Sequence, residues 1–192
     1  KAVGYAALAI TDECTMAGIV RAHVQAKESD LKLLVGSQFQ VEVGANGSFS
    51  VGQPFNLVVL ARNLNGYGNL CEFITALRRA TETKGTYQLT LESIAGSALT
   101  DCLVIISPGR ASTPYQLLAL GRWTLTHFAG RCWFGVEQLR MLDDELWLYQ
   151  LRQVSDDTAI PLVAVGDVHM HVRSRKPLQE VLTEFCDGRA VT

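Results

Sequence analysis

Two short stretches of the sequence combine residue types that bind metal ions. In the first, the apolar run "AALAI" leads directly to the acidic pair Asp12 and Glu13. In the second, "VGDVHMH", Asp167, His169 and His171 occupy alternate positions after another apolar run. Alternate residues of an extended chain point to the same side, and carboxylate oxygens together with imidazole nitrogens suit divalent ions. The sequence therefore indicates a candidate site for metal-assisted chemistry.

Both stretches also have a simpler interpretation. Asp12 and Glu13 precede a predicted helix at 14–29, and acidic side chains stabilise the N-terminal end of a helix. Asp167 could cap a turn, and the two histidines could hydrogen-bond to backbone groups. At this level the ligand role and the structural role stay equally open.

Buried strands separated by helices must position these residues. Apolar runs of about four to eight residues alternate with segments of helical periodicity. The predicted strands are 6–11, 31–39, 55–62, 101–109, 131–139 and 161–171, and the predicted helices are 14–29, 65–81, 113–129, 142–155 and 176–188. This order favours an α/β fold with parallel strands buried on both faces, in a barrel-like sheet whose functional side chains gather where the strands end. Without repeats, low-complexity tracts or linkers, residues 1–192 are expected to form a single domain.

Three further details can be checked against a structure. The apolar face predicted for the helix at 14–29 comprises Met16, Ile19, Val20 and Val24. Gly66 and Gly68, at the start of the helix at 65–81, predict a close approach of that helix to a neighbour. Arg78 and Arg79 are interpreted as the exposed end of the same helix.

Composition narrows the class of protein. The 192 residues carry 17 Lys and Arg against 19 Asp and Glu, a net charge of −2, so the chain lacks the excess positive charge of a stand-alone nucleic-acid binder. Its five cysteines are odd in number and never form a C-x-x-C pair, which indicates reduced thiols. No apolar run reaches the roughly 18 residues of a membrane span, and the first residues lack a signal-peptide pattern. We therefore expect a cytoplasmic protein with no membrane partner.

Four stretches together resemble a known family: "GYAALAITDECTMAGIVRAH", "LKLLVGSQF", "NLNGYGNLCEFIT" and "VAVGDVHMHVRSRKPLQEVL". They look like the polymerase and histidinol phosphatase (PHP) domain of bacterial C-family DNA polymerases, and are most similar to the error-prone paralogue of the polymerase III α subunit. The resemblance implies a distorted (β/α)7 barrel within a DNA-directed DNA polymerase. It also implies damage-induced translesion synthesis on DNA in the bacterial cytoplasm, with the sliding clamp and accessory mutagenesis proteins as partners.

The resemblance further implies that the chain is a fragment. The family's first strand, which carries an H-x-H pair, would precede Lys1. The palm, fingers and thumb, with the Mg²⁺ ions used for nucleotidyl transfer, would follow elsewhere in the parent enzyme. The chain alone is therefore expected to be inactive as a polymerase.

Several metal ligands implied by the resemblance are missing. The ligands that remain are Asp12, Asp167 and His169, with Glu13 and His171 as further candidates. The positions at which the family's ligands are replaced are Glu13 for a histidine, Gln38 for a glutamate and Leu139 for a histidine. A neutral amide does not offset the repulsion between neighbouring cations, and a leucine donates nothing. We therefore expect no tightly bound metal, with at most one weak Zn, Mn or Mg ion.

Two functions from different classes follow. The first is a structural PHP module of an error-prone polymerase with a degenerate metal site. The alternative is a metal-dependent phosphoesterase, either a 3′-exonuclease or a pyrophosphatase, in which the remaining ligands hold ions that activate water. A free-standing histidinol-phosphatase-like enzyme is disfavoured, because the closing helix leads toward the palm in the polymerases.

Overall fold

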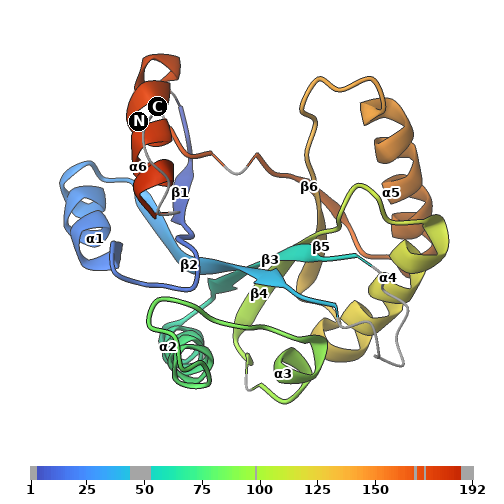
Figure 1. Cartoon of the computed structure of the whole chain (residues 1–192), viewed down its shortest axis with the longest axis horizontal. Helices are drawn as coiled ribbons and strands as arrows, with labels where there is room; N and C mark the ends of the chain where they lie inside the picture. Colours follow the sequence, from blue (N-terminus) through green and yellow to red (C-terminus); the bar gives the residue numbers. More distant parts are fainter. Residues whose placement is uncertain (1–3, 44–52, 98, 167, 171, 187–192) are drawn as a thin grey trace.

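A curved mixed sheet with helices on its outer side forms the body of the molecule (Figure 1). The computed structural model describes residues 4–43, 53–97, 99–166, 168–170 and 172–186. The strands are β1 (Ala7–Ile10), β2 (Lys32–Val41), β3 (Phe55–Ala61), β4 (Cys102–Ser107), β5 (Cys132–Val136) and β6 (Leu162–Ala164). The helices are α1 (Ile19–Glu28), α2 (Leu64–Arg79), α3 (Leu91–Ala95), α4 (Pro114–Phe128), α5 (Asp144–Thr158), the 3-10 turn η1 (Arg173–Arg175) and α6 (Lys176–Cys186).

The strands follow one another in the sheet in sequence order, β1 to β6. β1 pairs in parallel with β2, and β4, β5 and β6 also pair in parallel. β3, however, runs antiparallel to both of its neighbours, so the prediction of a wholly parallel sheet is wrong. Between β2 and β3 the described residues hold no crossover helix, which suits an antiparallel pair. β3 and β4 pair antiparallel although α2 and α3 lie between them in the sequence.

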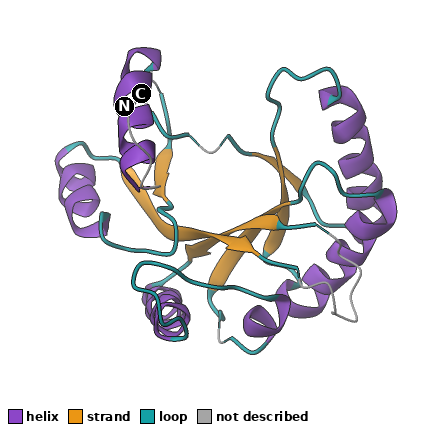
Figure 2. Ribbon diagram, in the orientation of Figure 1, coloured by secondary structure: helices purple, strands orange, loops and turns teal. Residues whose placement is uncertain are grey.

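The sheet makes a half-barrel. Figure 2 shows the strands following a curve, with the helices on its outer side. β1 and β6 are the two edges, and no strand of the described residues joins them. This architecture agrees with the expected barrel-like α/β fold.

The main core lies between the sheet and the outer helices. Alternate strand residues point outward into it; the fully buried ones include Phe39, Leu57, Val59, Val104, Ile106 and Phe134. Each such side chain contributes roughly 1.5–3 kcal/mol through its removal from water. Helix α2 packs on β2, β3 and β4, while α4 and α5 pack on each other and on β5. The alternating pattern therefore fixes which side of each strand meets the helices.

The other side of each strand faces the interior of the half-barrel. Val58, Leu60, Leu103, Ile105 and Trp133 occupy these alternate positions and are only half-buried. They form the apolar floor of the concave face. Polar residues replace them toward one end of the sheet, as described below.

Helix α2 begins where side chains satisfy its free backbone groups. The Asn63 side chain accepts a hydrogen bond of 2.9 Å from the N–H of Gly66. A Cβ added at Gly66 would lie 2.1 Å from the carbonyl oxygen of Asp101, whereas one added at Gly68 would meet nothing within 4 Å. The predicted close approach is therefore confirmed at Gly66 and wrong at Gly68.

Helices α1 and α6 are among those that expose apolar side chains. α1 starts only at Ile19, which is buried, but Val20 and Val24 are 74% and 48% exposed. The predicted apolar face is wrong for these two valines, because the contacts of α1 with β2 use another side of the helix. Helix α6, predicted at 176–188, likewise leaves Leu178, Val181 and Leu182 about half exposed.

Candidate functional site at the barrel mouth

The polar side chains of the concave face lie at one end of the strands. β2, β4, β5 and β6 finish at this end and β3 starts there. The chain after β1 reaches the same end beside Gln38, through a parallel bridge at Glu13. We call this end of the sheet the barrel mouth. Three residues singled out in the sequence, Asp12, Glu13 and Gln38, lie at this mouth.

The backbone of the first predicted motif is pinned to β2. The Ser37 hydroxyl donates a hydrogen bond of 2.7 Å to the carbonyl oxygen of Asp12. The N–H of Cys14 donates one of 2.9 Å to the carbonyl oxygen of Gln38. The Asp12 carboxylate itself is exposed and lies beside the start of α1, since a Cβ added at Gly18 would be 3.2 Å from its Oδ2. Both readings of Asp12, ligand or helix-end partner, keep a geometric basis.

The Glu13 carboxylate is hydrogen-bonded within the protein. The Tyr87 hydroxyl donates a hydrogen bond of 2.7 Å to Glu13 Oε1 and accepts one of 2.8 Å from the backbone N–H of Gln40. Burial of the phenol raises the pKa of Tyr87, and the neighbouring Glu13 carboxylate raises it further, outweighing the opposing effect of the Gln40 N–H. Glu13 therefore joins the loop after β1 to β2 through Tyr87.

Arg78 adds to the same network. Its guanidinium donates hydrogen bonds of 3.1 and 3.2 Å to the carbonyl oxygen of Cys14, and another to that of Gly85. The guanidinium also lies 5.4 Å from the ring centroid of Tyr87. The interpretation of Arg78 as an exposed helix end is wrong, whereas Arg79 is exposed as predicted.

The second predicted motif follows a shorter strand than expected. β6 ends at Ala164, so the alternation of an extended strand does not reach His169, which is exposed. Asp167 and His171 lie outside the described residues. Among the described residues, no three His, Cys, Asp or Glu side chains gather closely enough to hold a metal ion. The described part of the mouth therefore does not by itself fit the metal cluster that the family resemblance implies.

The other two replaced ligand positions, Gln38 and Leu139, differ from each other. Gln38 lies within β2, is half-buried and has its backbone paired with both β3 and the loop after β1. β5 ends at Val136, three positions before Leu139, whose side chain is 57% exposed. Leu139 therefore stands beyond the strand that was predicted to carry it.

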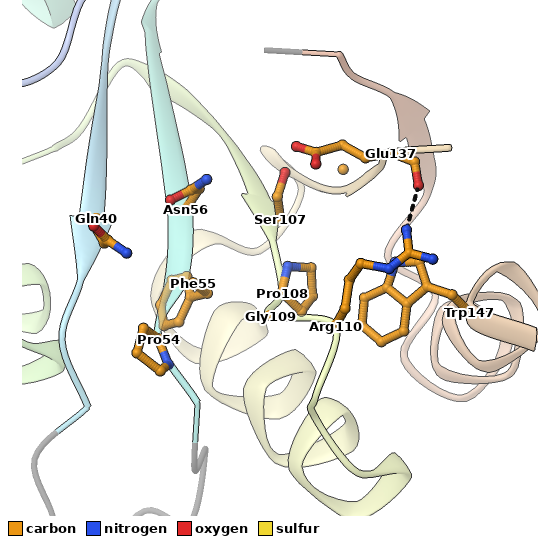
Figure 3. A pocket seen from close by; sticks show the side chains of 11 residues that line it. Gln40, Pro54, Phe55, Asn56, Ser107, Pro108, Gly109, Arg110, Glu137 and Trp147 are labelled. Atoms are coloured by element: carbon orange, nitrogen blue, oxygen red, sulfur yellow. Dashed lines mark hydrogen bonds between the residues drawn. The ribbon is translucent and has the colours of Figure 1, made fainter. Parts of the chain in front are cut away.

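The structure reveals a second polar group at the mouth that the sequence reasoning missed. Gln40, Asn56, Ser107 and Glu137, from four neighbouring strands or the loops that follow them, line one cavity of about 250 Å³ (Figure 3). Gln40 pairs across strands with Asn56, and Asn56 pairs with Ser107. A polar residue at the inward position of each strand end is the sequence signal that could have identified them.

Arg110 closes one wall of this cavity. Its Nη2 lies 2.6 Å from Asp144 Oδ1 and 3.1 Å from Asp143 Oδ1, and its Nη1 donates a hydrogen bond of 3.3 Å to the carbonyl oxygen of Glu137. The guanidinium lies 5.9 Å from the ring centroid of Trp147. Burial alone would raise the pKa of Asp144, but hydrogen bonds from Arg110 and from nearby backbone N–H groups hold it below its ordinary value.

Comparison with known proteins places this geometry in a family. The model of the PHP domain family matches residues 1–124, which is more than half of the chain. The chain belongs to the PHP domain family. In this PHP domain, the resemblance implies ligands at Asp12 and His169 among the described residues, and replaced ligands at Glu13, Gln38 and Leu139.

Curated relatives of this PHP domain are named error-prone DNA polymerases. It is 41% identical to the one from Bordetella parapertussis over 98% of this chain, and 46% identical to the one from Dechloromonas aromatica over 95% of it. The chain covers only 18% and 17% of the length of these two relatives. It is therefore homologous to one portion of much larger proteins.

Solved structures share the fold at low sequence identity. One is described as a putative metal-dependent phosphoesterase from Bifidobacterium adolescentis (TM-score 0.59, 12% identity, 88% of this chain and 79% of that chain). Another is an amidohydrolase from Chromobacterium violaceum with bound sulfate and no metal (TM-score 0.59, 15% identity, 88% and 78%). These likenesses establish a distorted α/β barrel architecture for the half-barrel. Within the described part, no helix is long and apolar enough to cross a membrane.

Proposed function

We propose that this PHP domain is a structural, non-catalytic module of a bacterial error-prone DNA polymerase. The parent enzyme would act on DNA in damage-induced translesion synthesis in the cytoplasm, together with the sliding clamp and accessory mutagenesis proteins, and its Mg²⁺ ions would lie in the polymerase portion. The names and 41–46% identity of the curated relatives support this assignment of the parent. The module would stiffen the enzyme by packing against its other domains.

One observation carries the structural role. Where the family resemblance implies a histidine ligand, Glu13 accepts a hydrogen bond from Tyr87, and the chain next to it is held by Arg78. The hydrogen bond from Tyr87 ties the loop after β1 to β2 and so stabilises the fold, at a position where the family resemblance implies an imidazole ligand. The neutral Gln38 and the displaced Leu139 supply no replacement charge.

Metal content tests the degenerate site. The protein, purified without chelator, is analysed for Zn, Mn, Mg and Fe beside its His169→Ala variant. We expect less than one tightly held ion per chain and no difference between the two proteins. Several stoichiometric ions that are lost in the variant would contradict the proposal.

Primer extension by the parent polymerase tests the structural role. Asp12→Ala removes an exposed candidate ligand, and Val59→Ala removes buried core volume from the module. We expect the first variant to keep full activity and heat stability, and the second to lose activity at a lower temperature, because cavities in a core destabilise the fold. Unchanged heat inactivation in Val59→Ala would show that the module does not support the enzyme.

A second candidate function is that of a metal-dependent phosphoesterase. It is favoured by the shared fold with a protein described as a putative metal-dependent phosphoesterase, and by the exposed Asp12 carboxylate at the mouth. The test is release of phosphate or of 3′ nucleotides with and without Mn²⁺. Stimulated activity that disappears in Asp167→Ala would favour this function over the structural role.

A further inference from the structure

A set of polar side chains at the barrel mouth has no partner in the part of the chain that the structure describes. Gln40, Asn56, Ser107 and Glu137 line the same cavity, and Figure 3 shows the Glu137 side chain extending across it toward Ser107. In the described part of the chain, none of these four side chains forms a hydrogen bond or ion pair with another residue. Gln40 and Asn56 are exposed and Ser107 and Glu137 are half-buried, so the polar atoms of all four are open to a ligand that enters the cavity.

A fifth group adds a donor. The Nε of Arg110 is buried, lies in a residue that lines the cavity, and has no hydrogen-bond partner among the described residues. The rest of this guanidinium is fixed by Asp144 and by the carbonyl oxygen of Glu137. An N–H held in place and left unpaired costs free energy unless a ligand or water accepts from it.

The charge around the cavity disfavours an anionic ligand. Arg110 is the only cation among the cavity-lining residues that the structure describes, and two aspartates already pair with it. Together with Glu137, the cavity and its surroundings hold three carboxylates and one guanidinium. Phosphate or another anion would be repelled. A single carboxylate inside the cavity also provides too little charge for a cluster of divalent cations.

The walls disfavour a flat aromatic ligand. The cavity has two aromatic neighbours, but Phe55 is 2% exposed and Trp147 is 5% exposed with the Arg110 guanidinium near its ring. Neither ring offers a free face on which a nucleobase could stack. Hydrogen bonding is therefore the main attraction that the cavity offers.

The donors and acceptors suit hydroxyl groups. Each amide and the serine hydroxyl both donate and accept, a carboxylate accepts from two neighbouring hydroxyls, and the arginine Nε donates. The volume of about 250 Å³ is below the range of drug-sized sites, so the ligand must be small. A Cβ added at Gly135 would lie 2.3 Å from Ser107 Oγ, so this glycine leaves room for the hydroxyl.

We propose that the barrel mouth of this PHP domain binds a small neutral polyol of about the size of a pentose ring, through Gln40, Asn56, Ser107, Glu137 and the Nε of Arg110. This site does not depend on the proposed polymerase parent. It would give the domain a binding function at a mouth whose described residues lack a metal-ligating cluster.

The test uses ribose as the probe and nuclear magnetic resonance of isotope-labelled protein as the measurement. The side-chain amide signals of Gln40 and Asn56 are assigned by their disappearance in the Gln40→Ala and Asn56→Ala variants. We expect both signals to shift with ribose and to saturate together, while inorganic phosphate and Mg²⁺ leave them unmoved. No shift with ribose, or a stronger response to phosphate, would overturn the proposal.

Variants separate this site from a non-specific effect of sugar. Asn56→Leu and Glu137→Gln should each weaken ribose binding by about tenfold, because each loses hydrogen bonds of the kind the cavity supplies. The control Gln25→Ala changes an exposed amide on α1 and should bind as the original protein does. If Asn56→Leu disturbs the fold, Ser107→Ala takes its place. Equal affinity in all these variants would contradict the proposal.

Discussion

Two sides of the barrel mouth use polar residues in opposite ways. On the tied side, defined by Glu13, Arg78 and Tyr87, every one of these side chains makes hydrogen bonds to another element of the fold. On the open side, defined by the four residues Gln40, Asn56, Ser107 and Glu137, the side chains share a cavity and have no partner in the described part of the chain. The contrast teaches that residue type alone does not distinguish a site from a structural network.

The family resemblance implies ligands on the tied side, whereas the proposed polyol site lies on the open side. Glu13 stands at a position where the resemblance implies a ligand, and its carboxylate accepts a hydrogen bond from Tyr87. The open side contains one charged residue and three neutral ones, so it does not look like a metal site in the sequence. If the two sides differ in this way, substitutions on the tied side lower the free energy of unfolding, and substitutions on the open side weaken ligand binding.

The largest effect on stability is expected for Arg78→Ala. The substitution leaves the carbonyl oxygens of Cys14 and Gly85 without their charged donor, so we expect a loss of about 2 kcal/mol in the free energy of unfolding. Urea unfolding measures it. The matched control is Arg79→Ala, the exposed neighbour, which should change stability by less than about 0.5 kcal/mol. Equal effects of the two substitutions would show that the hydrogen bonds of Arg78 do not stabilise the fold.

A smaller effect is expected for Tyr87→Phe. The variant keeps the ring but removes the hydroxyl that joins Glu13 to the backbone of Gln40, at a cost of about 1 kcal/mol. Tyr115→Phe is the control, since Tyr115 is exposed, and it should be neutral. A neutral Tyr87→Phe would mean that the hydroxyl is equally well satisfied by water.

The free energy of unfolding should depend on pH through the ionisation of Tyr87. Because the pKa of Tyr87 is raised in the folded protein, the unfolded chain loses the phenolic proton first as the pH rises above about 10. The unfolded state then binds fewer protons, and the free energy of unfolding falls with increasing pH. Unfolding in urea on both sides of that pH should show a shallower fall in Tyr87→Phe than in Tyr115→Phe. Identical slopes would argue against the raised pKa.

The smallest effect on stability belongs to the open side. Asn56→Ala and Ser107→Ala remove side chains that have no hydrogen-bond partner among the described residues, so each should change the free energy of unfolding by less than about 0.5 kcal/mol. Urea unfolding again provides the measurement. A loss as large as that of Tyr87→Phe in either variant would show that the open side is also structural, and the distinction between the two sides would fail.

Much of the fold could be predicted because its signals are local. The apolar runs at β2, β3 and β4 and the helical pattern at α2 and α4 fall within a few residues of the observed elements. Thr113 and Gln116, which form a capping box at the start of α4, act within one turn of chain. Such signals depend on neighbours in sequence. Strand direction was missed at β3, since it depends on how the chain returns.

The candidate site was predicted only in part, because its contacts join distant segments. The sequence by itself determined an α/β domain with polar residues at strand ends and the motifs of a PHP family member. Only the tertiary structure decided which of those residues form hydrogen bonds within the protein. The hydrogen bond from Tyr87 to Glu13 spans 74 positions of the chain, and the Asn56–Ser107 pair exists only because β3 lies beside β4. Periodicity reveals which face of a strand a side chain takes, but satisfaction of a polar group depends on what the fold brings against it.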